Sequence, residues 1–553
     1  MGGYLSSIFS LFSRELSKPP PQPIKGPWPR LKNILLYHFR GIFGILIPLI
    51  ICLALWGEKD KFHTTVQAVW IMMFWFLLLH PVHVPVVGFL PVFMFPLTGV
   101  LTTDDVTNCY FNQNIALMII GGMLSMLINN SGLDKRIALF ILTRKKLTGK
   151  MLLYKTSLAA FLLSIVCHRL LACVTIYSLF ENVPVPITGT DSDYLKTRNV
   201  INNAIQTSSI FGSIVMVHTS FTTMAFKAMY SELGPRDDIF NYLQLVAFTL
   251  PVAIVLLVLN TIYYSLLLNR NSEPGMNAMQ EGIDYQRRDL PAMSGHEKCS
   301  GIFTFAAILL FFLLYSEWLG YLYTPSGVND VTIAAIFVFI LSMLPKELFF
   351  FKYVTAKDKS DLPPRRPTSS LLFWKFVDQN TNYGYMFLIG SGVVLYRAIS
   401  KRALNTRIQQ NIEPLFDTDW YVASLQVVLL AGLLPNMISS IGACILFLPM
   451  ILSFGTTSTW SNKIHLGALG VGIASSFGFM HPFRHTPAFY CHNNGKTPIR
   501  EMRRLAIGSV VISIIVLWIA LCFYAPVVWP SEAPFYGPAV NITQIPPPPA
   551  PAR

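Results

Sequence analysis

The sequence predicts an all-α polytopic membrane protein built as an inverted-repeat carrier. Three observations predict this class: the composition, the long apolar runs, and polar or Gly/Pro interruptions at corresponding places in two halves. Of the 553 residues, 53% are hydrophobic and only 13% are charged. A soluble domain carries roughly 25% charged residues to cover its surface. Most of this protein's surface must therefore face lipid.

Apolar runs with few or no charges recur along the chain. Several of them reach or approach the roughly 20 residues that a helix needs to cross the hydrocarbon layer. Backbone groups in lipid must form their hydrogen bonds within the segment, so these runs are predicted to be helices. The runs are Gly41–Gly57, Val66–Leu79, Ile115–Ile128, Leu243–Leu268, Ile302–Leu314, Val331–Leu344, Leu425–Leu434 and Ile507–Tyr524. Together with the interrupted segments described below, they predict about 11 spans.

The charge and the cysteines exclude several other classes of protein. The formal charge of +14 comes largely from Lys and Arg in short loops between the runs. Such residues stay on the cytoplasmic side of a membrane, which accounts for the charge without nucleic acid. The eight cysteines are scattered without the paired spacing of disulfide frameworks or zinc sites. Because no nucleophile–base constellation or phosphate loop stands out either, we expect no enzyme, no cofactor and no metal site.

The flanking charges predict the orientation in the membrane. The tail over residues 1–40 is basic, which predicts a cytoplasmic N-terminus. Counting spans forward then predicts that the Pro-rich tail, residues 529–553, is extracellular. This tail contains Asn541-Ile-Thr543, an acceptor pattern for N-glycosylation. An external glycosylation site at Asn541 favours the plasma membrane.

This orientation requires two apolar stretches that enter the membrane and return without crossing. The first spans about 150–181 and has His168-Arg169 near its middle, and the second spans about 419–455 with Pro435-Asn436 near its middle. Irregular tips of such hairpins are tolerated where they are buried in protein or line a cavity. The first is predicted to open from the inside and the second from the outside, as an inverted repeat requires.

Each hairpin is followed by an interrupted helix, at about 206–231 and about 463–490. The chain thus divides into a first half, 41–298, and a second half, 299–528. Corresponding interruptions in two halves are the best indication in a sequence of a binding site at the membrane midplane. The alternative is chance placement of Gly and Pro in ordinary spans.

At these positions the chain resembles the divalent anion/sodium symporters, which carry dicarboxylates, citrate or sulfate. The resemblance covers about residues 40 to 528 and is carried by Phe95-Pro96-Leu97-Thr98-Gly99, Ile120-Gly121-Gly122, Leu133-Asp134-Lys135-Arg136-Ile137-Ala138-Leu139, Leu388-Ile389-Gly390-Ser391-Gly392 and Ser476-Phe477-Gly478-Phe479-Met480-His481-Pro482. The resemblance implies a homodimer in which each protomer has a scaffold part and a moving transport part. It also implies a small anionic substrate and Na⁺ as the coupling ion.

The resemblance further implies that substrate and sodium bind where the hairpin tips meet the broken helices. The family's Ser-Asn-Thr motif at the first tip is replaced by His168-Arg169, whereas the second tip keeps hydroxyls at Ser439 and Ser440. The candidate substrate-binding residues are His168, Arg169, Thr219, Ser439, Ser440, Arg484, His485, Thr486 and Pro487. The candidate cation-site residues are Ser439, Ser440, Gly442, Thr486 and Ala488.

Arg169 is the departure with the clearest chemical consequence. A guanidinium at membrane depth costs about 2.5–3.5 kcal/mol even on the mild scale, so it needs a partner or a wet cavity. Its fork of donors suits a carboxylate or sulfate. We hypothesise that Arg169 acts as a tethered cation that attracts the anion and repels Na⁺ from the first site. The alternatives are an internal ion pair and snorkelling of the side chain to the cytoplasmic face.

Four histidines, His168, His218, His481 and His485, lie near the same region. Imidazoles titrate near neutral pH and would make transport sensitive to protons. The alternative for each is a hydrogen-bonded packing residue.

Three functional hypotheses follow. The first is a secondary-active transporter of di- or tricarboxylates, such as succinate or citrate, with altered or lost sodium coupling. The second is a conventional sodium symporter in which the substituted residues suffice, favoured by Ser439, Ser440 and Thr486. The third is a non-transporting member of the same fold with a binding or regulatory role. A channel is disfavoured because paired hairpins and broken helices serve alternating access.

Overall fold

Helices form the described part of the chain. The computed structural model describes residues 26–55, 61–143, 148–181, 192–233, 239–268, 273–314, 328–346, 369–401, 418–453, 461–482 and 485–530. Within these ranges the β structure is limited to a single bridge between Pro345 and Ser370. The predicted all-α class, with two hairpins and two broken helices, is confirmed.

The helices up to residue 267 contain the first hairpin and the first broken helix. They are α2 (Pro27–Leu55), α3 (Lys61–Leu79), α4 (Val84–Val87), α5 (Leu90–Thr98), α6 (Thr103–Thr107), η1 (Asn108–Tyr110), α7 (Gln113–Ser125), α8 (Leu127–Ser131), α9 (Leu133–Leu142), α10 (Gly149–Val166), α11 (Arg169–Glu181), α12 (Ser192–Val215), η2 (Val217–Thr219), α13 (Phe221–Leu233) and α14 (Tyr242–Leu267).

The later helices contain the second hairpin and the second broken helix. They are α15 (Glu273–Arg288), α16 (Gly295–Leu314), α18 (Asp330–Met343), α19 (Trp374–Asn380), α20 (Gly384–Lys401), α22 (Trp420–Met437), α23 (Ser440–Ser453), η6 (Ser461–Lys463), α24 (Ile464–Ala474), α25 (Thr486–Asn493), α26 (Ile499–Ile519), η7 (Ala520–Tyr524) and α27 (Ala525–Val528).

Seven described helical stretches are long and apolar enough to cross a membrane. They are Phe62–Leu79, Thr103–Ser131, Gly149–Val166, Tyr242–Leu267, Gly295–Leu314, Trp420–Met437 and Ile499–Val528. Shorter apolar helices of 10–17 residues, such as Ser440–Ser453 and Ile464–Ala474, accompany them. The expected number of about 11 spans stays a prediction, because length and composition alone do not decide which of the shorter helices cross.

The first hairpin consists of α10 and α11. Helix α10 ends at Val166 because Cys167 adopts an extended conformation, with φ −96° and ψ 157°. Helix α11 then begins at Arg169, and its first turn is closed by the amides of Leu171 and Ala172, which donate to the His168 carbonyl over 2.9 and 3.1 Å. Two residues thus separate the helices, and the N-terminus of α11 lies at the tip.

The second hairpin, α22 and α23, has the same construction. Ile438 is extended, with φ −116° and ψ −178°, and ends α22. Ser439 then caps α23, because its Oγ accepts a hydrogen bond of 3.0 Å from the Gly442 amide. Capping hydroxyls satisfy amides at a helix start that have no partner within the helix. The N-terminus of α23 therefore also lies at its hairpin tip.

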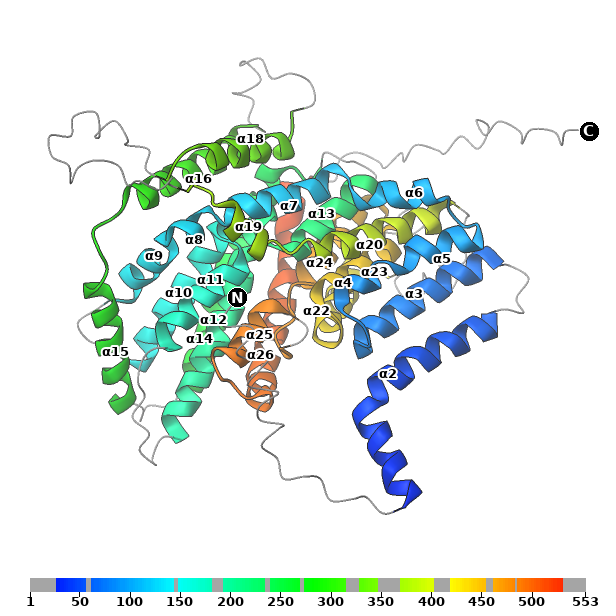
Figure 1. Ribbon diagram of the computed structural model, residues 1–553, viewed down its shortest axis with the longest axis horizontal. Helices are drawn as coiled ribbons and strands as arrows, with labels where there is room; N and C mark the ends of the chain where they lie inside the picture. The colour runs from blue at the N-terminus through cyan, green and yellow to red at the C-terminus, as the bar shows by residue number, and fades with distance from the viewer. Residues whose placement is uncertain are drawn as a thin grey trace, which may run out of the picture.

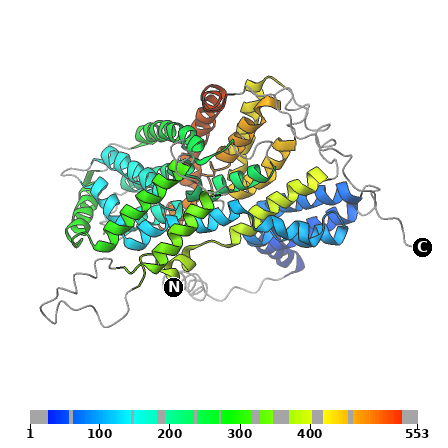
Figure 2. The same ribbon diagram turned by 90° about the horizontal axis from the view of Figure 1, so that it is seen from above.

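Two hydrophobic clusters organise the packing of the described residues. The smaller one joins α9, α10, α11 and the first part of α12 to α25 and the start of α26. The larger one joins α3, α5, α7, α13, α20, α22, α23 and α24. In Figures 1 and 2 the cyan helices α9 to α12 lie on one side of the molecule, and α3 and α5 lie beside α20 on the other. Helix α2 leads away from the body (Figure 1).

A close backbone approach joins the first hairpin to the first broken helix. A Cβ added to Gly212 of α12 would overlap the carbonyl oxygen of Phe161 in α10. Beside this contact the Ser164 hydroxyl donates to the Ser209 hydroxyl over 2.9 Å. Glycine at 212 is what lets the two helices touch backbone to backbone.

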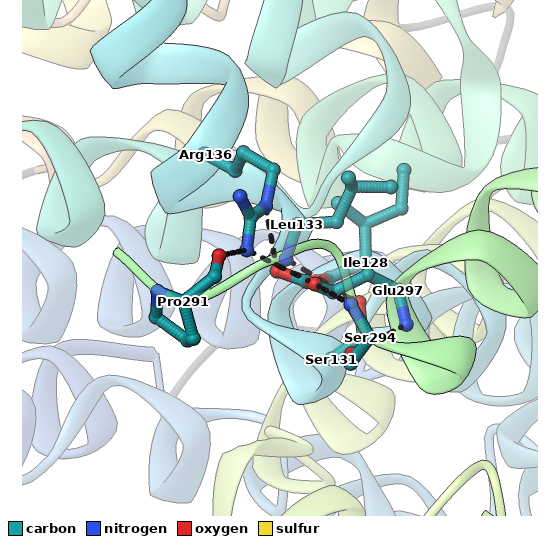
Figure 3. Close-up of polar contacts among 7 residues, drawn as sticks. All are labelled: Ile128, Ser131, Leu133, Arg136, Pro291, Ser294 and Glu297. Carbon is teal, nitrogen blue, oxygen red and sulfur yellow. Dashed lines mark hydrogen bonds and ion pairs between the residues drawn. The ribbon is translucent and has the colours of Figure 1, made fainter. Parts of the chain in front are cut away.

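A polar tie joins α9 to the start of α16, as Figure 3 shows. Arg136 donates from Nε and Nη2 to the two Glu297 carboxylate oxygens over 2.9 and 3.2 Å, and from Nη2 to the Pro291 carbonyl over 2.9 Å. Ser294 and Glu297 form a reciprocal capping box, in which the Ser294 amide donates to the carboxylate over 2.6 Å and the Glu297 amide donates to the Ser294 hydroxyl over 3.2 Å. This tie fixes where α16 begins.

We predict that Gly212→Ala lowers the stability of the protein. The new methyl group has to push α12 away from α10, and such overpacking costs about 1–3 kcal/mol. Gly122→Ala is the matched control, because a Cβ at Gly122 meets no atom within 4 Å. Thermal unfolding of the purified variants in detergent measures the difference. Equal midpoints for the two variants would contradict the close approach.

Candidate substrate and cation site

The hairpin tips and the helix breaks form one continuous chain of contacts. At the first tip, the His168 ring packs on Phe221, the first residue of α13, with ring centroids 4.8 Å apart. The first broken helix reaches the second break where the Gln206 side-chain amide donates to the Phe479 carbonyl over 3.1 Å. The second break lies against the second tip, since a Cβ on Gly478 would lie 3.0 Å from Ser440 Oγ. The predicted site elements therefore come together.

Side chains satisfy the backbone where the first helix breaks. The Thr219 hydroxyl donates to the carbonyls of Ser213 and Met216 over 3.1 and 2.8 Å. From α14, the Thr249 hydroxyl donates to the Val215 carbonyl over 3.1 Å. These carbonyls end a helix in buried surroundings and would otherwise lack donors. Thr219 therefore uses its proton on the backbone, and only its lone pairs remain for a substrate or cation.

Asn436 of α22 satisfies backbone groups in the same way at the second break. Its Oδ1 accepts from the amides of Phe479 and Met480 over 3.0 and 3.1 Å. Its Nδ2 donates to the Phe477 carbonyl over 3.0 Å. Phe477, Phe479 and Met480 are thus held by the second hairpin through one side chain.

Aromatic and imidazole rings fill the region around the first tip. His168 is buried, and its neighbour Phe221 packs in turn on Tyr385 of α20 at 4.9 Å between centroids. At the break, His218 Nδ1 and the Tyr242 hydroxyl share a hydrogen bond of 3.0 Å. The His218 side chain also packs on α7, where a Cβ added to Gly121 would lie 3.0 Å away. The His168 ring therefore stands where the resemblance implies a hydroxyl ligand.

The second tip keeps small polar groups. Ser439 is used as the cap of α23, whereas Ser440 Oγ is buried and has no hydrogen-bond partner within the described residues. The hydroxyls of Ser475 and Ser476, which lie just before Gly478 in the sequence, are also buried without a hydrogen-bond partner among the described residues. Buried hydroxyls of this kind are rare and need an explanation such as an ion or water. Neutral oxygens are also suited to sodium.

The remaining candidates at the second site lie at the start of α25. His485 precedes the helix and is buried, and its carbonyl accepts the Phe489 amide over 3.0 Å. Thr486 and Pro487 form the first turn, in which Thr486 is half-buried. Ala488 is buried in the smaller cluster. Gly442 lies in the first turn of α23, where a Cβ would meet Leu77 and Ser439 Oγ at 2.7 Å.

Three candidates lie partly or wholly outside the described residues. Arg169 is described as the first residue of α11, but its side chain is not. Arg484 and the glycosylation candidate Asn541 lie outside the described ranges altogether. Their roles remain predictions.

The sequence analysis missed the residues that hold the breaks together. Gln206 is a buried amide and Asn436 a half-buried one, and the partners of both lie far away in the chain. An amide side chain within an apolar stretch could have indicated them, because such a group is costly in a membrane unless it has a hydrogen-bond partner. Phe221 and Tyr385 carried no signal, because aromatic residues are ordinary in membrane helices.

Two hairpins that face two broken helices define a polytopic membrane transport protein, and its transported ligand would lie at the interruptions. The chain matches the sodium:sulfate symporter transmembrane region over residues 41–530 and belongs to this family.

Several known proteins are similar to the chain over most of its length. "Protein I'm not dead yet" of Drosophila melanogaster is 22% identical over 94% of this chain and 93% of that protein. The sodium-dependent high-affinity dicarboxylate transporter 3 of Caenorhabditis elegans is 22% identical over 88% of each chain. The Na(+)/citrate cotransporter of Rattus norvegicus is 21% identical over 88% of this chain and 94% of that protein. The solved YdaH transporter of Alcanivorax borkumensis has a TM-score of 0.46 and 13% identity, covering 79% and 88% of the two chains.

We predict that Asn436→Ala destabilises the protein. The substitution removes the acceptor of the Phe479 and Met480 amides, and leaving a buried amide such as that of Phe479 unpaired costs about 1–3 kcal/mol. Asn380→Ala is the control, because the Asn380 amide donates within its own helix, to Phe376 over 2.7 Å. Thermal unfolding in detergent should show the loss for Asn436→Ala only. Comparable losses in both variants would mean that Asn436 does not hold the break.

Proposed function

We propose that the protein is a secondary-active, sodium-coupled transporter of di- or tricarboxylates, with one sodium site at the second hairpin and an altered first site. Membership of the sodium:sulfate symporter family supports transport of a small anion across a membrane. Relatives named as dicarboxylate and citrate transporters support the organic-anion class. The single observation that carries the coupling proposal is the difference between the two hairpin tips.

Buried neutral oxygens support sodium binding at the second tip. Ser440 at the second tip and Ser475 and Ser476 before the second break each carry a buried hydroxyl, and none of the three has a hydrogen-bond partner in the described chain. Gly478 leaves space for close approach to Ser440 Oγ and to the Pro435 carbonyl, both 3.0 Å from an added Cβ. Hydroxyl and carbonyl oxygens would coordinate a dehydrated Na⁺ there.

The first tip argues for weaker coupling. The His168 ring takes the position of the family's Ser ligand and packs on the Phe221 ring, and the nearby His218 imidazole is bonded to Tyr242. Arg169 begins α11 at the same tip. A guanidinium there would repel Na⁺ while it attracted a carboxylate. The N-termini of α11 and α23 add partial positive charge for the anion.

We further propose the setting of the transporter. A basic N-terminal tail favours a cytoplasmic N-terminus, and the resulting span order puts Asn541 outside, where it would be glycosylated. This orientation favours the plasma membrane. The family resemblance favours a homodimer. A non-transporting member of the fold is the second candidate, favoured by the replacement of the family's motif by His168-Arg169 at the first tip.

Uptake of labelled succinate, citrate and sulfate into proteoliposomes, in sodium against choline, tests the proposal. We expect uptake of a di- or tricarboxylate that is faster in sodium, with a Hill coefficient for sodium near one. A normally inserted protein that transports none of these anions would favour the non-transporting alternative. Ser440→Ala should raise the sodium concentration needed for half-maximal uptake, whereas Ser391→Ala, which removes a buried hydroxyl bonded within α20, should not.

The double change His168→Ser with Arg169→Asn should increase the sodium dependence of uptake. It removes the tethered cation and restores neutral oxygens at the first tip, so the Hill coefficient for sodium should rise above that of the unchanged protein. Arg169→Lys alone retains a positive charge and serves as the control. If the double variant transports with unchanged sodium dependence, Arg169 is not the cause of altered coupling.

A further inference from the structure

A buried ion pair joins the first broken helix to a helix outside both hairpins. Lys227 Nζ of α13 donates to Asp330 Oδ2 of α18 over 2.7 Å. Their side chains are 12% and 4% exposed, respectively. Asp330 is the first residue of α18, where a negative charge is favoured by the helix dipole. The second carboxylate oxygen, Oδ1, is buried and accepts no hydrogen bond from the described residues.

Packing alone does not require this pair. Replacing a buried ion pair by apolar side chains of similar volume is often neutral or stabilising, because both charges lose their hydration. The best-attested uses of such pairs are to fix register and to act as a switch. Lys227 lies on the same helix as Phe221, so it links the first tip to α18.

Lys227 belongs to a stripe of polar residues on α13. Thr223, Lys227 and Ser231 are spaced four residues apart and therefore lie along one face of the helix. Thr223 is 2% exposed, and its hydroxyl has no hydrogen-bond partner in the described part of the chain. At the other end of the stripe, the Asn114 side-chain amide of α7 donates to the Ser231 hydroxyl. The stripe thus faces α7 and α18.

The residues of the stripe lie one helical turn apart, so each would take the place of the next if α13 slid by one turn. A slide of α13 by one turn, about 5.4 Å, would bring Thr223 to the place of Lys227 and Lys227 to the place of Ser231. The Thr223 hydroxyl, which ends nearer to its own helix than the Lys227 ammonium does, would then reach Asp330 through a bridging water, and the ammonium would face the side-chain oxygen of Asn114. Shifts of one turn between packed helices are a known form of switching.

We propose that Asp330 and the stripe Thr223, Lys227 and Ser231 form a polar track between α13 and α18, latched by the Lys227–Asp330 ion pair in the conformation described here. The pair parts when α13 slides by one turn and carries the first site with it. This inference rests on the proposed transport function, because only a transporter requires these helices to move past each other.

The first test measures the slide without transport. Thr223→Cys places a thiol on the track, in a background with Cys52→Ser, since Cys52 is exposed and the other seven cysteines are buried. We expect a water-soluble maleimide to label Cys at 223 about tenfold faster when Lys227→Gln and Asp330→Asn remove the charges, equivalent to about 1.4 kcal/mol. Thr222→Cys, also buried but off the stripe, is the control. Equal rates with and without the charges, or equal acceleration at 222, would overturn the track.

The second test locks the latch. Lys227→Cys with Asp330→Cys is joined by a bifunctional thiol reagent with a spacer, because the length of Lys leaves too wide a gap for a disulfide. The cross-link should abolish anion uptake. Gln113→Cys with Asn329→Cys joins α7 to α18, which are bonded at those residues over 2.9 Å and move together in the proposal, so uptake should persist. Normal uptake by the 227–330 cross-linked protein would overturn the proposal.

The two tests separate this inference from the proposed function. If the unchanged protein carries none of the anions but labelling at 223 still depends on the charges, the track stands and the transport function fails. If uptake is normal and labelling is independent of the charges, the transport function stands and the track fails.

Discussion

The structure depends on one constraint: helices that stop inside an apolar body must satisfy their free backbone groups. A helix that ends in water leaves its last carbonyls to the solvent, but a buried break has no such option. Here Thr219 and Thr249 serve the carbonyls of the first break, and Asn436 and Gln206 serve the groups of the second. Since all of these residues except Thr219 come from neighbouring helices, each break is defined by the packing around it. Binding groups exposed at the breaks are therefore positioned by the same contacts that make the breaks possible.

The two hairpin tips solve this constraint in different ways, and the difference bears on coupling. The second tip uses Ser439 as a helix cap and leaves Ser440 buried next to Gly478. At the first tip, the His168 carbonyl accepts the first hydrogen bonds of α11, and the rings of His168 and Phe221 pack on each other. In the proposed function, a cation would bind the oxygens of the second tip, whereas the rings of the first tip would offer it few ligands. Pseudo-symmetry in the backbone therefore does not imply two equal ion sites.

Much of the fold was predictable, because interruptions inside apolar runs are local features of the sequence. Pro435, Ser439 and Gly478 mark the second hairpin and break, and the helices end near them. The number of spans was not predictable, because several apolar helices have only 10–17 residues. The hydrogen-bond and ion-pair partners within the structure could not be predicted from the sequence either. Gln206 and Phe479 are 273 residues apart, and Lys227 and Asp330 are 103 apart, so only the packed structure brings them together.

The two ion pairs described here differ in how many bonds hold each carboxylate, and this difference separates a fixed joint from an exchangeable one. Glu297 accepts from Arg136 twice and from the Ser294 amide, inside a capping box, so displacing Arg136 would break several bonds at once. Asp330 has one bond to Lys227 and a second oxygen without a donor among the described residues. A water bridged to a hydroxyl one turn away can replace that single bond with little loss in hydrogen bonding. The joint at α9 and α16 therefore suits a scaffold, and the contact between α13 and α18 suits a surface that moves.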